Sequence, residues 1–187
     1  MQEENKVKIE GIIRSFRLRG DIDEKTEYLG RNVLDMIRES IKTNNAQLMA
    51  FLMAQGLVLG HTEQQNLITT VGRTVLARLL SGDATYSGEI NYGALGTSST
   101  AVANSDTTLG TEVYRKIASS QTYSDNISYV DFYYTATETT GTYEEFGNFI
   151  DGTASVDTGQ LWSHIVTGGW VKSGTESLFI SCQYTIT

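Results

Sequence analysis

The stretch LFISCQYTIT, residues 178–187, decides the fold of this chain. Apolar residues at positions 178, 180, 182, 184 and 186 alternate with the polar residues Ser181, Gln183, Thr185 and Thr187. A period of two predicts a strand with one face on a core and the other face toward water or a neighbour. The pattern continues to residue 187, and chain ends are ordered when something holds them. We therefore expect this end of the chain to be built into a sheet, which is typical of a compact module.

Length and composition bound the class of protein. The 187 residues suffice for one domain, alone or with an arm or subdomain. No apolar run approaches the roughly 18 to 20 residues of a membrane span, and the start, MQEENK, does not resemble a secretory signal. The single cysteine, Cys182, excludes an internal disulfide framework and a zinc site with several cysteines. Because Cys182 lies on the apolar side of the last stretch, we interpret it as a core residue.

Charge is distributed unevenly along the chain. The net charge is −8, but residues 1–81 carry 11 of the 14 Lys and Arg and 10 of the 22 acids. Residues 82–187 contain three basic residues, Arg115, Lys116 and Lys172, against 12 acids. Phosphate binding needs a cationic surface, so nucleic acid is not an expected partner of this acidic part. Its abundant Ser and Thr suit the solvent side of strands.

The shift in composition near residue 82 predicts three parts: an N-terminal arm (1–30), a helical region (31–82) and a β-domain (83–187). The spacing of apolar residues predicts helices over 31–43 and 46–59. Thr62 and Gln65 have the spacing of a capping box for a third helix, which ends at Gly82. Within residues 1–30, the stretch 7–13 could be a short strand or part of the arm. The arm is expected to become ordered against a neighbouring subunit.

Beyond residue 82 the pattern indicates strands separated by Gly-, Asn- or Asp-containing turns. The predicted strands are 90–96, 112–118, 126–137, 142–149, 161–166 and 176–187. Six short strands with regularly spaced turns are typical of an antiparallel sandwich. The expected fold class is α+β: an N-terminal helical region followed by an antiparallel, jelly-roll-like β-sandwich.

Candidate catalytic groups are sparse. His61 and His164 lie in different segments without a His or Cys at ligand spacing, so neither a metal nor another cofactor is expected. The adjacent acids Glu144 and Glu145 would point to opposite faces of a strand and could not share one substrate. Asp106 is expected to fix a bend by bonding the backbone that follows it, and an ion pair of Arg115 with a nearby carboxylate is expected. We expect no enzyme, although distant residues can still form a Ser-His-Asp arrangement.

Five segments in order resemble a recurrent type of structural protein of tailed bacteriophages. They are residues 66–82, 90–97 (INYGALGT), 105–112 (SDTTLGTE) with Arg115, 143–149 (YEEFGNF), and 161–164 (LWSH) followed by Lys172 and the terminal strand. The similarity covers about residues 66–187. Proteins of this type often carry Arg where this chain has His164, which puts a shared role for that side chain in doubt.

The resemblance implies a non-enzymatic virion component that is assembled in the cytoplasm of the bacterial host. It would be a repeated subunit of the tail, baseplate, fibre-attachment or neck region, in a homo-oligomeric ring or trimer contacting other virion proteins and no membrane. The apolar segment 48–59 is the expected subunit contact. Two alternatives remain: a capsid decoration or head-fibre protein, and a carbohydrate- or receptor-binding module that uses Tyr123, Tyr143 or Trp170 as a platform. The expected contact residues are Leu48, Phe51, Leu52, Met53 and Leu57.

Overall fold

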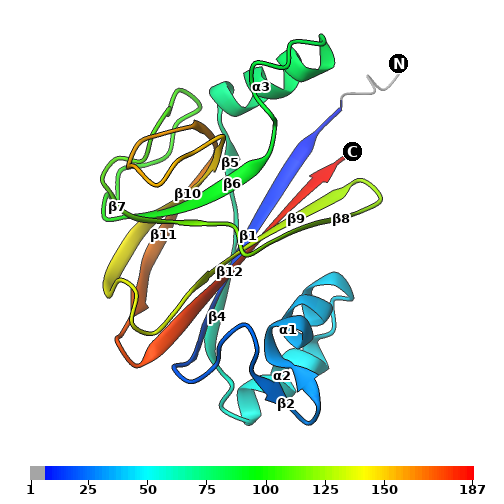
Figure 1. Ribbon diagram of the computed structural model, residues 1–187, viewed down its shortest axis with the longest axis vertical. Coiled ribbons are helices and arrows are strands. Elements are labelled where there is room, and N and C mark those ends of the chain that lie inside the picture. The colour runs from blue at the N-terminus through cyan, green and yellow to red at the C-terminus, as the bar shows by residue number, and fades with distance from the viewer. Residues whose placement is uncertain (1–6) are drawn as a thin grey trace.

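The computed structural model describes residues 7–187, which form mostly antiparallel strands with three short helices (Figure 1). Two five-stranded antiparallel sheets make up the body. Sheet I contains, in spatial order, β4 (Val58–Gln65), β1 (Ile9–Arg19), β12 (Glu176–Ile186), β9 (Ile127–Tyr134) and β8 (Ser120–Ser124). Sheet II contains β5 (Leu67–Ile68), β11 (Gln160–Lys172), β10 (Gly141–Ile150), β6 (Ile90–Gly96) and β7 (Glu112–Ile117). A small hairpin pairs β2 (Glu27–Tyr28) with β3 (Arg31–Asn32).

The main core lies between the two sheets. Alternate residues of β12, from Leu178 to Tyr184, are buried there against side chains of sheet II such as Phe146 and Ile165. The predicted core face of the terminal strand is therefore confirmed. Ile186, at the end of the strand, is 48% exposed and lies at the margin of this core.

The strand β12 is in the middle of sheet I, not at its edge. It pairs with β9 on one side and with β1 along its whole length on the other, from Ile9 opposite Ile186 to Arg19 opposite Glu176. Residues 9–19, assigned to the arm, are thus an internal strand, which agrees with the alternative of a short strand at residues 7–13 and corrects the arm. Apolar residues such as Ile13 and Phe16 place β1 between two layers of core. Residues 1–6 of the predicted arm lie outside the described residues.

Two helices cover the outer face of sheet I (Figure 1). The helices α1 (Val33–Lys42) and α2 (Ala46–Ala54) each begin after an asparagine whose side chain accepts a hydrogen bond from the first turn. A second core forms beneath them, and Phe179 of β12 is buried in it. Consequently the outer face of β12 meets helices, and Ser181 on that face is 2% exposed.

The third helix, α3 (Thr70–Leu80), starts later than the sequence predicts. Thr62 and Gln65 belong to β4, where Thr62 shares a hydrogen bond of 2.7 Å with Ser15 of β1. The N-cap is instead Thr69, whose hydroxyl accepts from the backbone N–H of Gly72 at 3.1 Å. Because residues 31–82 also contain β4 and β5, the expected helical region is not confirmed.

Each of the six predicted strands corresponds to a strand of the structure, with differences in length. β11 continues past the predicted end at 166 because Gly168 and Gly169, both at positive φ, form a bulge and not a turn. β8 was not predicted, since its sequence SQTYS has no apolar alternation and it pairs at the edge of sheet I.

Candidate functional site

The outer face of sheet II is covered by two long connections, and Val71 of α3 also packs there. One connection, residues 97–111, joins β6 to β7, and the other, residues 151–159, joins β10 to β11. Beneath them lies a small buried cluster formed by Ala94, Leu109, Phe149 and Leu161. Gly147 of β10 lets this cluster pack closely on the sheet, because a Cβ there would come within 2.8 Å of Leu109 and 2.9 Å of Leu161. Both connections are therefore packed closely on this face of sheet II.

Glu145 of β10 holds the first connection. Its Oε1 accepts hydrogen bonds from the backbone N–H groups of Ser98 (3.1 Å) and Thr111 (2.7 Å), and its Oε2 accepts from that of Gly110 (2.8 Å). The residue is 1% exposed. A carboxylate bonded to several backbone N–H groups is a strong acceptor, so this side chain ties both ends of the connection to the sheet.

His164 of β11 links Glu145 to the middle of the same connection. Its Nε2 lies 3.0 Å from Oε2 of Glu145, and its Nδ1 lies 2.9 Å from Oδ2 of Asp106. Both nitrogens donate to carboxylates when the imidazole carries both protons. Asp106 also accepts a bond of 2.8 Å from the backbone N–H of Ala103, which precedes it. The sequence predicted that the Asp106 side chain would bond to the backbone that follows it. In the structure its carboxylate instead accepts from the backbone that precedes it.

A hollow of about 330 Å³ lies beside this triplet of Asp106, His164 and Glu145. The connection lines it mostly with hydroxyl-bearing side chains: Ser98, Thr100, Ser105, Thr107 and Thr108. In a catalytic Ser-His-Asp site one ring nitrogen faces the nucleophile. Here both ring nitrogens face carboxylates, and the four acceptor positions of Glu145 are filled by three N–H groups and the imidazole. The geometry therefore suits a fixed connection better than proton transfer.

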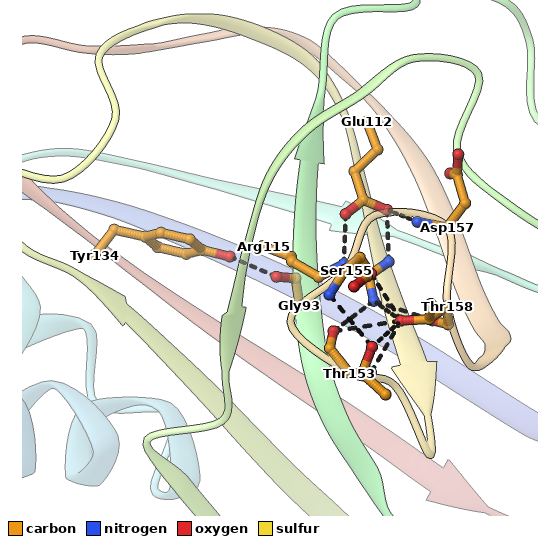
Figure 2. Close-up of polar contacts among 8 residues, drawn as sticks. All are labelled: Gly93, Glu112, Arg115, Tyr134, Thr153, Ser155, Asp157 and Thr158. Atoms are coloured by element: carbon orange, nitrogen blue, oxygen red, sulfur yellow. Dashed lines mark hydrogen bonds and ion pairs between the residues drawn. The ribbon is translucent and has the colours of Figure 1, made fainter.

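Arg115 and Glu112 of β7 hold the second connection (Figure 2). The guanidinium pairs with both carboxylate oxygens at 2.5 and 2.6 Å, and its Nη1 donates to the carbonyl oxygens of Thr153 and Thr158, both at 3.0 Å. The carboxylate also accepts from the backbone N–H of Asp157 at 3.2 Å. The expected ion pair of Arg115 with a nearby carboxylate is confirmed, and it is buried.

Lys172 performs a comparable role at the connection between β9 and β10. It is 2% exposed, and its amine donates to the backbone carbonyls of Ala136, Glu138 and Thr139 at 3.2, 2.7 and 3.0 Å. Burial lowers the pKa of this amine. Three oxygen acceptors match the three donors of an ammonium group, so Lys172 closes that turn.

The predicted subunit-contact residues are placed in and after α2, on the outer side of sheet I. Leu52 and Leu57 are 0% and 1% exposed and belong to the core beneath the helix. Leu48 and Phe51 are partly buried against the same core, whereas Met53 is 40% exposed. Of the predicted platforms, Tyr143 and Trp170 are buried core residues and cannot stack on a ligand, while Tyr123 is 83% exposed.

Comparison with protein-family models, with curated proteins and with solved structures finds no match to this chain. Within residues 7–187, no helix is long and apolar enough to cross a membrane, and no group of three or more His, Cys, Asp or Glu side chains could hold a metal ion. His61 stacks on Phe16, with ring centroids 5.9 Å apart, and is far in sequence from the triplet.

The sequence singled out Asp106, Arg115 and His164 but did not bring them together, and it placed Glu145 only on the opposite strand face from Glu144. The signal for Glu145 was its place in the segment YEEFGNF, where Gly147 and Phe149 share its face. An acid on the same side of a strand as a buried phenylalanine and a glycine is unlike a solvent-facing one. Glu144, on the other face, is partly exposed.

Proposed function

We propose that this protein is a non-enzymatic structural subunit of a tailed-bacteriophage virion that assembles as a homo-oligomer in the tail, baseplate, fibre-attachment or neck region. One observation carries the proposal. The segments that resemble phage structural proteins supply the residues that fix the two connections: Asp106, Glu112, Arg115, Glu145 and His164. Two sheets packed face to face are compatible with the jelly-roll-like sandwich that the resemblance implies.

The hydrogen bonds of the residues that fix the two connections support a structural role. Glu145 and His164 are saturated by hydrogen bonds, and the Arg115–Glu112 pair is directed into a loop backbone. Groups that already have partners have no capacity left for a substrate, whereas rigid connections on a rigid sheet form a surface that subunits can recognise.

The helix α2 is the proposed contact surface between copies. Its sequence, AQLMAFLMA, contains no charged residue, although a surface helix normally carries charge on its solvent side. Its outward residues include Ala46, Ala50 and Met53, and beside them lies a groove of about 300 Å³ floored by Phe16. A protruding methionine at the rim of a groove that is lined by both apolar and polar residues could insert into the same groove of a second copy, which is what a two-fold contact requires.

The edge of this groove carries balanced charge. Arg14 and Glu63 form an ion pair of 2.7 Å there, so a second copy would meet both signs and no net repulsion. With a two-fold axis through the groove, Arg14 of each copy would face Glu63 of the other copy. The second copy therefore meets this surface without burying an unpaired charge.

The experiment that tests the assembly is the mass of the purified full-length protein by light scattering and sedimentation. We expect an oligomer that Ala50→Glu dissociates, because a charge would be buried in the contact. The matched control is Leu80→Glu, at an apolar position of α3 that is 82% exposed and outside the surface. A monomer at every soluble concentration would contradict the assembly proposal. An oligomer unaffected by Ala50→Glu would contradict α2 as its contact.

The location in the virion is tested separately with an antibody against the chain and electron microscopy of labelled particles. We expect label at the tail or neck. Label over the head surface would favour the alternative of a capsid decoration or head-fibre protein.

The second alternative, a glycan-binding module, is favoured by one observation: Tyr123 on the edge strand β8 is 83% exposed. A glycan array distinguishes it from the structural proposal. We expect no binding, and binding that is lost in Tyr123→Ala would favour the alternative.

A further inference from the structure

Sheet I and sheet II each end in two edge strands, and β4 is the longest of the four. In the part of the chain that the structure describes, no strand pairs with the outer side of β4. Of the other edge strands, β5 has two residues, β7 is interrupted by a bulge at Val113, and β8 contains no charged residue. An edge strand leaves backbone N–H and C=O groups unpaired, so it can accept a further strand. β4 is thus the edge with the most backbone free for such pairing.

Little in β4 opposes pairing with another strand. It follows β1 in regular register over residues 60–65, and its bulge, at Leu59, lies near the start of the strand. His61, Thr62 and Glu63, in the middle of the strand, are exposed. Proline and lysine, which commonly block edge strands, are absent from β4. The regular part therefore presents a free edge to a second chain.

This free edge borders the groove beside α2. His61 and Glu63 line the groove together with Ala50 and Met53 of α2, and His61 stacks there on Phe16. β4 follows α2 in the chain after three residues, 55–57. A second copy that sits on α2 about a two-fold axis perpendicular to sheet I would bring its own β4 alongside. The edge and the proposed contact surface are therefore one continuous area.

We propose that β4 pairs antiparallel with β4 of a second copy, with Thr62 on the two-fold axis, so that the two copies of sheet I join into one continuous sheet. The inference deepens the proposed two-fold contact at α2 and rests on it. The occupant of the edge is fixed by symmetry, because a two-fold contact presents the same residues from both sides. Backbone hydrogen bonds across the axis would satisfy the groups that the edge leaves unpaired.

Side-chain chemistry selects Thr62 as the centre of the pairing. Directly opposite residues of an antiparallel pair lie on the same face of the sheet, so the register can shift only in steps that keep the faces matched. With Thr62 at the centre, His61 of each copy is opposite Glu63 of the other, and an imidazole N–H can donate to the carboxylate. With Glu63 at the centre, two carboxylates would be opposite each other, which is destabilising. With His61 at the centre, Glu63 would be opposite the apolar Leu59.

The first test is disulfide formation by Thr62→Cys in the full-length protein under mild oxidation. The two Cβ atoms at the axis would be about 4.5 to 5.5 Å apart, which a disulfide can bridge with a small adjustment. The native Cys182 is 0% exposed and should not compete. We expect a covalent dimer on non-reducing gels, at concentrations at which light scattering shows the oligomer.

Two cysteine variants are matched controls. Glu63→Cys places the two cysteines at diagonal positions about 7 to 8 Å apart, beyond the normal range of a disulfide. Thr122→Cys lies in the middle of β8, the other edge strand of sheet I, and is also exposed. We expect each control to cross-link at least roughly tenfold more slowly than Thr62→Cys. Faster cross-linking through position 63 than through position 62 would overturn the register.

Hydrogen exchange in the unmodified protein is an independent measurement, and it decides the matter if Thr62→Cys does not fold. The N–H groups of β4 that point away from β1 should exchange roughly tenfold more slowly in the assembled protein than in the diluted one, while those at the free edge of β8 should not change. An oligomer in which Thr62→Cys cross-links no faster than Thr122→Cys, and in which β4 gains no protection, would overturn the edge pairing and leave α2 as the contact. A monomer at every soluble concentration would overturn the two-fold contact and the pairing with it.

Discussion

Arg115 and Glu112 share one face of β7 although they are three residues apart. Residues at that spacing on a regular strand point to opposite faces. The register of β6 and β7 shifts here: Leu95 is opposite Tyr114, but Gly96 is opposite Glu112, so Val113 is the extra residue of a bulge. The bulge turns Glu112 toward Arg115, and the pair ends with side chains only 1% and 3% exposed.

Removing one partner of this pair should destabilise the protein strongly. We expect Glu112→Gln to lower the free energy of unfolding by about 3 to 5 kcal/mol, because the guanidinium would remain buried without its counter-charge. Urea unfolding measures the effect. The control is Glu39→Gln, in the exposed pair with Arg31, which should cost less than about 1 kcal/mol. Equal effects of the two variants would refute the structural weight given to the buried pair.

His164 should be replaceable by arginine but not by leucine. His164→Leu leaves the carboxylates of Asp106 and Glu145 facing a buried apolar group and should cost about 3 kcal/mol. His164→Arg supplies several N–H donors to the same carboxylates and should cost less than about 1 kcal/mol. Urea unfolding compares the two, and hydrogen exchange at the N–H of Gly110 and Thr111 reports whether the connection stays closed. A leucine variant as stable as the arginine variant would contradict the bridging role.

The folded protein should lose stability in alkaline solution. Burial raises the pKa of the Cys182 thiol above its ordinary 9.0, and burial also raises the pKa of Tyr134 and Tyr184 well above 10.0. These groups stay protonated in the folded state after the unfolded chain has released its protons. Their contribution to stability is therefore complete below pH 9.0 and declines as the pH rises above that value.

The expected decline approaches about 1.4 kcal/mol per pH unit for each group that only the unfolded state ionises. Urea midpoints measured across the alkaline range test this. Cys182→Ala should remove the part of the decline that begins near pH 9.0 and leave the later part, which belongs to the tyrosines. A free energy of unfolding that stays constant through this range would contradict the raised pKa values of Cys182, Tyr134 and Tyr184.

Deleting residues 1–30 should abolish folding. The deletion removes β1, which pairs with β12 on one side and β4 on the other, and thereby exposes the edges of both strands. Unpaired edges in the middle of a sheet favour aggregation. Far-UV circular dichroism and size-exclusion chromatography measure the outcome, and deletion of residues 1–6 is the control. A soluble, cooperatively folding protein without β1 would contradict the central position of that strand.

Local patterns predicted the strands of residues 83–187 except β8, and the existence of all three helices. They did so because alternation and helical spacing are short-range properties. Of the strand β1, only residues up to 13 were a strand candidate, because charged residues interrupt its apolar pattern. Arg14 and Arg17 find their partners, Glu63 and Glu176, on the neighbouring strands, and that pairing is a property of the fold.

The candidate site was predictable only as separate residues. His164 meets Asp106 across 58 positions and Glu145 across 19. The bulge that joins Glu112 to Arg115 depends on the register with β6, which no spacing in the sequence reveals. The sequence thus shows which strands contain charged residues. Strand pairing decides which of these residues contact each other.

The pairing of β1 with β12 joins residues 9–19 to residues 176–186. During synthesis the first of these strands leaves the ribosome long before the second has been made. Its apolar residues therefore lack their partner strand in the nascent chain. Contacts between positions so distant in sequence make folding slow and expose intermediates to aggregation. The centre of sheet I can therefore form only after residue 186 has emerged, and we expect the nascent chain to depend on chaperones until then.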